Sequence, residues 1–229
     1  MLVEGILKSG IFLKRPNRFL VILKTSKGLR RCHLRDPGRL SELLRPGAVI
    51  IFRERNAVGR KTDCEVLLVW DRRVWTIVNS SLHNDLAIEV IESGLLTELG
   101  NPRSIKREFR FGNSRIDFLL EDGEKTLLEV KGCTLVRDGL ALFPDAPSER
   151  GKRHVLNLIK ALKSGYRAAI LFLVMRPDAE ILSPNWEVDP EFSSALTKAA
   201  ESGVMMLAVK FAYKRREIIP VGRIPVKVV

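Results

Sequence analysis

The chain has 229 residues, of which 45% are hydrophobic and 29% are charged. That composition is typical of a globular protein and excludes a low-complexity chain. No segment has the roughly 18 uncharged apolar residues that a membrane helix needs, and Glu4 and Lys8 interrupt the start of the chain, unlike a signal peptide. The spacing of Cys32, Cys64 and Cys133 indicates neither a disulfide framework nor a zinc cluster. We therefore expect a cytoplasmic protein of one or two domains with no membrane partner.

Positive charge is concentrated in the first third of the chain. Residues 1–80 carry 17 Lys and Arg against 7 Asp and Glu, whereas residues 81–229 carry 22 against 20. A strongly basic segment beside a nearly neutral one favours a polyanionic partner, and nucleic acid is the usual one. The alternative is a thermophile surface rich in Lys and Arg, but such surfaces tend to balance these residues with Glu, which residues 1–80 do not do.

The first 80 residues predict a small all-β domain. The expected strands are Ile6–Leu13, Arg18–Lys24, Leu29–His33, Ala48–Arg53, Glu65–Trp70 and Val74–Val78. A hairpin is expected at Ser26-Lys27-Gly28, and Asp36-Pro37-Gly38 predicts a turn into a short helical segment, Leu40–Leu44. Five or six short strands with one small helix fit a partly open Greek-key barrel such as an OB-fold. The pattern leaves small β-barrels of other topology open.

From about Leu82 helices alternate with strands. The expected elements are a helix ending at Gly94, strands Phe109–Leu120 and Thr126–Val136, a helix from Pro147 to Ser164, strand Ala168–Met175, a helix from Asp189 to Gly203, and strand Val204–Tyr213. This order implies right-handed crossovers and a parallel core with helices on both faces, and the leading hairpin makes the sheet mixed. We therefore expect an OB-fold-like domain at 1–80 and an α/β domain at 81–229.

Three charged residues on the predicted hairpin suggest chemistry. Glu129 and Lys131 share one face of their strand, while Val130 points to the other. Asp117 joins them only if the loop has an odd number of residues, with Gly123 in a left-handed conformation, or if a bulge corrects the register. A site at these residues therefore predicts a three-residue loop or a bulge.

Paired carboxylates at this position suit a divalent cation. At a separation of about 4 Å they repel by up to roughly 4 kcal/mol at an effective dielectric of 20, so they share a proton or hold a cation. Oxygen ligands suit Mg²⁺ or Mn²⁺, and Lys131 would position an attacking water and stabilise developing charge. The alternative, charges alternating on a solvated strand face, fits poorly because Leu127, Leu128 and Val130 indicate an interior strand. The pattern predicts metal-assisted phosphodiester hydrolysis with Asp117, Glu129 and Lys131 as catalytic residues.

Further residues are candidates for this site or its surroundings. Glu89 is either an additional metal ligand or an exposed helix glutamate. Asp145 and Glu149 are either accessory site residues or, respectively, a helix cap and a complement to the helix dipole. His154 has no evident partner in the sequence. The expected DNA-binding residues are Arg18, Arg30, Arg31 and Arg39 in the basic domain, and Arg150, Lys152 and Arg153 at the positive end of the long helix.

Several motifs carry a resemblance to the sugar fermentation stimulation protein family. They are Asn17-Arg18-Phe19-Leu20, Asp36-Pro37-Gly38-Arg39-Leu40, Arg115-Ile116-Asp117-Phe118, Glu129-Val130-Lys131, Phe143-Pro144-Asp145-Ala146 and Glu149-Arg150-Gly151. The resemblance covers essentially the whole chain. It implies an N-terminal OB-fold, a C-terminal nuclease-like domain of the PD-(D/E)xK type, and DNA binding without marked sequence preference. Asp36 replaces an asparagine often found in the family, and Ile116 replaces the proline of the broader nuclease motif.

The resemblance leaves two functions of different class open. One is a Mg²⁺- or Mn²⁺-dependent deoxyribonuclease guided to DNA by the basic barrel. The other is a non-catalytic DNA-binding regulator of sugar metabolism genes, notably those of maltose. RNA processing is a third alternative that an OB-fold permits. The sequence leaves these functions open. It also leaves open the form of the nucleic acid and the oligomeric state, for which a homodimer is one option.

Overall fold

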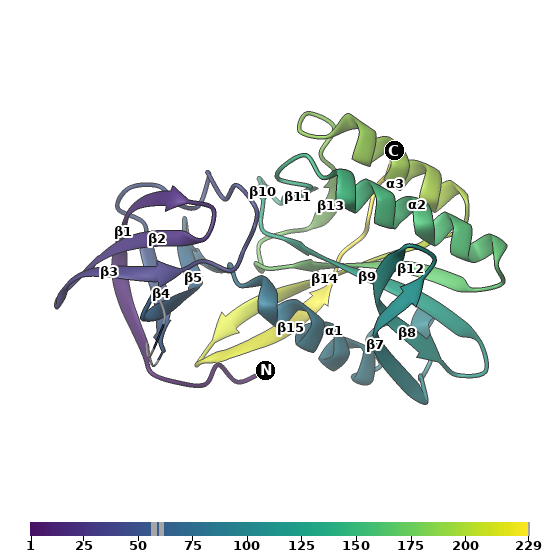
Figure 1. Cartoon of the computed structure of the whole chain (residues 1–229), viewed down its shortest axis with the longest axis horizontal. Helices are drawn as coiled ribbons and strands as arrows, with labels where there is room; N and C mark the ends of the chain where they lie inside the picture. Colours follow the sequence, from purple (N-terminus) through teal and green to yellow (C-terminus); the bar gives the residue numbers. More distant parts are fainter. Residues whose placement is uncertain (56–58, 60–61, 229) are drawn as a thin grey trace.

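The computed structural model describes residues 1–55, 59 and 62–228, which form two domains lying side by side (Figure 1). The N-terminal barrel, in purple and blue, is joined through a short connection to a larger α/β domain. Within these described residues, no helix combines the length and apolarity needed to cross a membrane.

Six strands build the N-terminal barrel. They are β1 (Leu7–Asn17), β2 (Leu20–Thr25), β3 (Gly28–His33), β4 (Val49–Glu54), β5 (Cys64–Asp71) and β6 (Val74–Ile77). Their order is β3-β2-β1-β4-β5-β6, and a parallel pairing of β3 with β5 closes the barrel. Irregular register within β1 lets this one strand bend and pair with both β2 and β4. The expected OB-fold-like barrel is confirmed, with the β2–β3 hairpin at Ser26-Lys27.

Two features of the barrel differ from what its sequence indicated. The expected helix Leu40–Leu44 is only a turn, in which Leu43 and Leu44 both donate to the carbonyl of Leu40, whose φ is 52°. A left-handed residue at that point stops helical propagation. In addition, Cys32 and Cys64 form a disulfide between β3 and β5. Only barrel closure makes these two cysteines neighbours, so their spacing along the chain did not indicate it.

The C-terminal domain is a six-stranded mixed sheet with helices on both faces. Its elements are η1 (Ser80–Leu82), α1 (His83–Glu92), η2 (Thr97–Leu99), β7 (Ser104–Phe111), β8 (Ser114–Glu121), β9 (Lys125–Cys133), β10 (Val136–Arg137), β11 (Leu140–Phe143), α2 (Glu149–Lys163), β12 (Arg167–Val174), β13 (Ile181–Pro184), α3 (Pro190–Glu201), β14 (Met205–Lys214) and β15 (Glu217–Arg223). The sheet order is β15-β14-β12-β9-β8-β7, with β9, β12 and β14 parallel. One apolar layer packs under α1 and the other under α2 and α3, which confirms the expected architecture (Figure 1).

Some predicted strands have different limits. The expected strand Phe109–Leu120 is divided by a turn at Gly112-Asn113 into the hairpin β7–β8. The edge strand β15 and the small sheet β10-β11-β13 were not predicted. Edge strands are short and partly exposed, so they lack the apolar run of a central strand, and β15 even contains Pro220, which an edge strand tolerates.

The two domains are joined by buried and backbone interactions as well as by the connecting chain. The amino group of Met1 pairs with Glu89 on α1 at 2.9 Å, and the N–H of Val3 donates to the carbonyl of Arg216. The first residues therefore pack on the C-terminal domain before the chain enters the barrel.

A buried arginine provides the strongest polar link. Arg176, 2% exposed, follows β12 and donates to Asp71 of the barrel at 2.9 Å. It also makes two hydrogen bonds of 2.7 Å to the carboxylate of Asp178. Moving the barrel away would remove the Asp71 partner and leave this buried guanidinium paired with Asp178 alone, which favours the observed position of the barrel.

Replacing Arg176 with alanine should destabilise the protein by about 3–5 kcal/mol, because Asp71 and Asp178 would lose their buried partner. Denaturant unfolding followed by circular dichroism measures the change. Arg72→Ala is a matched control, since Arg72 also contacts an aspartate across the domains, Asp138, but both side chains are largely exposed. It should cost less than about 1 kcal/mol. Equal losses in the two variants would show that Arg176 does not hold the domains together.

Candidate active site

The β8–β9 hairpin brings the predicted site residues together. Glu121 pairs with Lys125 and Phe118 with Leu128, so the loop between the strands has three residues, with Gly123 at φ 98°. The expected odd loop is confirmed. Continuing this register would place Asp117 opposite Glu129, but the ladder ends at Phe118 and the two strands separate there.

Short polar contacts connect the site residues where the strands separate. An oxygen of Asp117, Oδ2, accepts a hydrogen bond of 2.8 Å from the backbone N–H of Val130. The Oε1 atom of Glu129 accepts a hydrogen bond of 2.6 Å from Lys131 Nζ and also lies 2.6 Å from His154 Nδ1. The Val130 side chain packs in the opposite apolar layer with α1, as expected from strand alternation. The acidic residues, the lysine and the histidine thus occupy one face of the sheet, under α2.

Burial and neighbouring charge give the two carboxylates different pKa values. Burial, with repulsion from Glu129, raises the pKa of Asp117 to about 6. Burial also acts to raise the pKa of Glu129, but the charge of Lys131 and the hydrogen bond from His154 outweigh it, so this pKa lies below its usual range. The pair therefore holds one firmly ionised carboxylate beside another that takes up a proton readily.

The donor set fits a hydrated divalent cation. Glu129 is 2% exposed, and its second oxygen, Oε2, is buried without a hydrogen-bond partner in the described structure. A buried carboxylate oxygen without a donor is costly unless it meets a cation or a water. Within residues 1–55, 59 and 62–228, no three or more His, Cys, Asp or Glu side chains form a preassembled metal cluster. Mg²⁺ and Mn²⁺ suit such a sparse site, because Mg²⁺ commonly uses one or two carboxylates together with waters and phosphate oxygens.

His154 is a site residue that the sequence analysis missed. It is 5% exposed and contacts Glu129 from the first half of α2. A signal was present, since His154 precedes Val155 and lies four residues before Leu158, on the buried stripe of the helix. A polar side chain on the buried face of a helix needs a hydrogen-bond partner, and β9, which lies under α2, supplies Glu129.

The other three candidates, Glu89, Asp145 and Glu149, form no hydrogen bond or ion pair with Asp117 or Glu129 in the described structure. Glu89 pairs with the Met1 amino group and lies on α1, which packs on the face of the sheet opposite to α2 and His154. Asp145 does not cap α2, because Ser148 fills that role by accepting from the N–H of Gly151. Glu149 is largely exposed and pairs with its neighbour on the helix surface.

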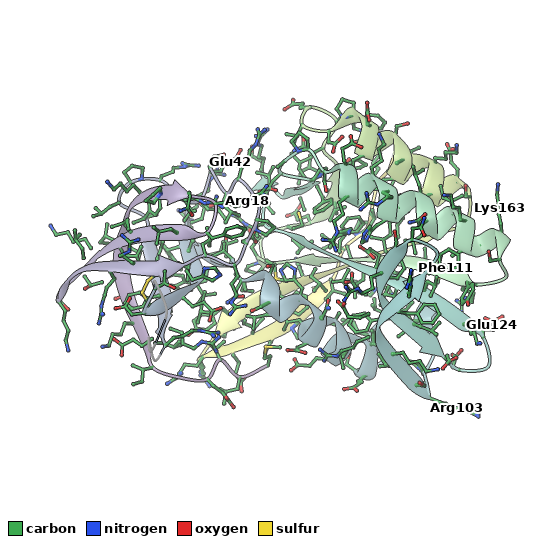
Figure 2. The ribbon with its side chains drawn as sticks, in the orientation of Figure 1. Arg18, Glu42, Arg103, Phe111, Glu124 and Lys163 are labelled. Atoms are coloured by element: carbon green, nitrogen blue, oxygen red, sulfur yellow. A yellow bond between two sulfur atoms is a disulfide. The ribbon has the colours of Figure 1, made fainter. Side chains whose placement is uncertain are left out.

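A cleft of about 260 Å³ between the domains opens onto Lys131. It is lined on the barrel side by Arg18, Asp36 and Gly38, and on the other side by His83, Lys131 and Asp145, among others. Figure 2 shows Arg18 on the side of the barrel that faces the C-terminal domain. The structure therefore brings a predicted DNA-binding residue and a predicted catalytic residue to the same cleft.

Close backbone contacts fix the walls of this cleft. A Cβ atom on Gly38 would lie 2.4 Å from Asp145 Oδ2, and one on Gly132 would lie 2.0 Å from a ring carbon of His83. A side chain at Gly38 would therefore displace the Asp145 carboxylate, and one at Gly132 would displace the His83 ring. Two of the motifs noted in the sequence, around Gly38 and Asp145, thus meet each other across the domain interface, where Asp145 also accepts from the N–H of Leu40 at 3.4 Å.

A second groove, rich in arginine, shares His154 with the site. It has a volume of about 590 Å³ and is lined by residues of the β7–β8 hairpin and the start of α2, including Arg110, Arg115, Arg150, Arg153 and His154. Arg115 pairs with Glu108. In the part of the chain that the structure describes, Arg110, Arg150 and Arg153 have no carboxylate partner.

The predicted DNA-binding residues fall into two groups. Arg30 pairs with Glu54 and Asp63, and Lys152 pairs with Glu191. Their charges are thus already compensated. The others are exposed and, within the described residues, form no ion pair; they are Arg18, Arg31, Arg39, Arg150 and Arg153.

The fold and the site define a protein in which an OB-fold-like barrel is joined to a mixed-sheet α/β domain that carries a carboxylate–lysine site. A family profile described as "SfsA N-terminal OB domain" matches residues 13–78, and "Sugar fermentation stimulation protein RE domain" matches residues 81–217. The chain belongs to the sugar fermentation stimulation protein family, which confirms the resemblance found in its motifs.

Individual relatives match over most of their length. The sugar fermentation stimulation protein homolog of Methanothermobacter thermautotrophicus is 48% identical over 231 residues, covering 99% of this chain and 96% of the relative. That of Sulfolobus acidocaldarius is 47% identical, covering 85% and 78%. The solved structure of Pyrococcus furiosus SfsA in complex with Ca²⁺ is 33% identical, with a TM-score of 0.90 over 99% of both chains.

Replacing Asp117 with asparagine should stabilise the metal-free protein at neutral and higher pH. Folding raises the Asp117 pKa from its usual 3.8 to about 6, so the folded protein holds the proton more tightly than the unfolded chain. The parent therefore loses stability as pH rises from about 4 to about 6, by on the order of 2–3 kcal/mol, and the loss persists above pH 6. Asparagine keeps an oxygen for the Val130 N–H but carries no charge.

Thermal melts of parent and variant from pH 4 to 8, with and without Mn²⁺, measure both effects. The difference between the two proteins isolates Asp117 from other groups that titrate in this range, such as Asp36, whose pKa burial also raises to about 6. We expect Mn²⁺ to stabilise the parent and not the variant, because a ligand that binds the folded state raises its stability. Equal stabilisation by Mn²⁺ in both would exclude Asp117 as a ligand.

Proposed function

We propose that the protein is a Mg²⁺- or Mn²⁺-dependent deoxyribonuclease whose active site is formed by Asp117, Glu129 and Lys131. The observation that carries this proposal is the buried, ionised carboxylate of Glu129. Its Oε1 atom contacts Lys131 and His154, and its Oε2 atom has no hydrogen-bond partner among the described residues. What sets Glu129 apart is that this oxygen belongs to a carboxylate only 2% exposed, beside a second carboxylate, Asp117, whose pKa is raised by burial and by the charge of Glu129. Two neighbouring buried carboxylates need a proton or a cation between them. A cation at Oε2 and Asp117 would complete the site.

Each residue has a distinct role in this proposal. A bound divalent ion would supply Lewis acidity toward a phosphoryl oxygen and a nucleophilic water. Asp117 and Glu129 would hold the ion, and His154 would fix the orientation of Glu129 as an outer-shell partner. The ammonium of Lys131, already beside Glu129, would stabilise the negative charge that develops on the phosphoryl oxygens. The related Pyrococcus furiosus protein was solved in complex with Ca²⁺, which supports an affinity of this fold for cations that prefer oxygen ligands.

Arginines on both sides of the carboxylates support DNA as the substrate. Arg18 lines the interdomain cleft beside Lys131, and the groove with Arg150 and Arg153 adjoins His154. Cations without carboxylate partners are available to phosphates, and such contacts do not depend on base sequence. This arrangement favours binding without marked sequence preference.

DNA affinity should depend steeply on salt, and only the arginines without carboxylate partners should contribute to the slope. If about five phosphates are neutralised, log K should fall with log salt at a slope near −4 to −5. Arg31→Ala should reduce the slope by roughly 0.7–0.9, as one lost phosphate contact predicts. Arg30→Ala, which changes net charge equally, should leave the slope unchanged because Arg30 is paired with Glu54 and Asp63. Titrations by fluorescence anisotropy measure the slopes, and equal losses in both variants would contradict the assignment.

Lys131→Ala should abolish metal-dependent cleavage and leave DNA affinity nearly unchanged. A group that acts on charge formed only in the transition state changes the rate and hardly affects ground-state binding. Loss of such a group typically lowers the rate by about 10²–10³, whereas Kd should stay within roughly threefold of the parent, because a transition-state contact adds little to ground-state affinity. The assay compares single-stranded, double-stranded and branched DNA with Mg²⁺ or Mn²⁺. The control is Lys163→Ala, which removes an exposed lysine at the far end of α2.

Two results would overturn this proposal. A parent that binds DNA but cleaves no form of it with either metal would be a non-catalytic DNA-binding protein, as expected of a regulator of sugar metabolism genes. Cleavage that persists undiminished in Lys131→Ala would place the activity at another site or in a contaminant.

A further inference from the structure

The barrel carries an exposed phenylalanine, Phe19, next in the chain to Arg18 of the interdomain cleft. Phe19 lies in the turn between β1 and β2 and is 48% exposed. Its ring stacks on His33 at the end of β3, with centroids 6.2 Å apart and planes inclined by 24°. The Phe19 ring thus packs against His33 on one face, while much of the ring remains exposed to solvent.

The backbone around Phe19 is held on both sides. Its N–H donates to Asn17 Oδ1 at 3.0 Å, and its carbonyl accepts from Leu34 N at 2.9 Å. The preceding carbonyl, that of Arg18, accepts from the Arg15 guanidinium at 2.7 Å. The ring is therefore presented by a fixed turn, which lowers the entropy cost of placing a ligand against it.

Position and charge indicate which ligand this ring suits. Arg18, the adjacent residue, lines the cleft that also contains Lys131. On β3, Arg31 shares a strand face with His33, and neither Arg18 nor Arg31 has a carboxylate partner within the described residues. An apolar docking segment of a protein would gain nothing from these charges. A flat, apolar base attached to a phosphate would satisfy both the ring and the arginines.

We propose that Phe19 is a stacking platform for a base of an unpaired DNA strand whose backbone passes Arg18 into the cleft toward Lys131. In a duplex each base face is covered by its neighbours, so only a single-stranded or locally opened segment offers a free face to the ring. The inference rests on the proposed function and specifies its substrate class, a strand that is unpaired next to the site.

The test compares single-stranded and duplex DNA of the same sequence, bound without divalent metal so that cleavage cannot interfere. Phe19→Ala should weaken single-strand binding by about 5- to 100-fold, the usual effect of losing one base–aromatic stack, and change duplex binding less than roughly twofold, because a paired base has no free face for the ring. Phe19→Leu, which keeps apolar bulk for folding, should lose most of the same affinity. Leu29→Ala is the matched control, since Leu29 is also apolar and exposed, but lies at the opposite end of the β2–β3 hairpin.

A strand that contains 2-aminopurine gives a second readout. Its fluorescence should be quenched on binding to the parent and to Leu29→Ala, and much less on binding to Phe19→Leu at saturating protein. Equal weakening of single-strand and duplex binding, or unchanged quenching in Phe19→Leu, would overturn the stacking proposal. Neither result depends on cleavage. A parent that shows stacking but no hydrolysis would therefore contradict the nuclease proposal alone and leave the stacking proposal in place. A parent that binds no DNA would overturn both.

Discussion

The negative charge of Glu129 inside the C-terminal domain is the constraint around which the site is organised. A carboxylate at 2% exposure is stable there only because Lys131 and His154 both contact its Oε1 atom. Glu65, the other fully buried glutamate of the described chain, offers a contrast, since its two oxygens face Arg35 on one side and Arg53 and Arg55 on the other. Both oxygens of Glu65 therefore lie in ion pairs with arginines, whereas Oε2 of Glu129 has neither an ion pair nor a hydrogen bond within the described residues.

The strand separation beside Glu129 follows from the same constraint. The carboxylate of Asp117 accepts a hydrogen bond from the N–H of Val130. It thus replaces a backbone carbonyl as the acceptor at the point where the β8–β9 ladder ends. This exchange satisfies the backbone and holds the second carboxylate near the first, at the cost of a raised pKa for Asp117. In the proposed metal complex the cation would offset that cost, so the stability of the hairpin would depend on metal binding.

The fixed contact between the domains extends the site to the barrel. Arg176 links the C-terminal domain to Asp71, and Arg15 holds the turn at Gly38 by donating to the carbonyls of residues 38 and 39. That turn packs against Asp145 without room for a side chain. These contacts hold the barrel where Arg18 lines the cleft that contains Lys131.

The amino-acid sequence by itself determined the two domains' fold classes and the face on which Glu129 and Lys131 lie, because strand and helix periodicities are local properties of the chain. It also restricted Asp117 to an odd loop, since side chains alternate strictly along a strand. Only the tertiary structure decided that His154 contacts Glu129, that Cys32 bonds to Cys64, and that Arg30 is paired with Asp63 while Arg31 forms no ion pair with any described residue. The first two contacts join residues far apart in the chain. The third depends on which carboxylates lie near each arginine in the folded barrel. Local sequence patterns contain neither kind of information.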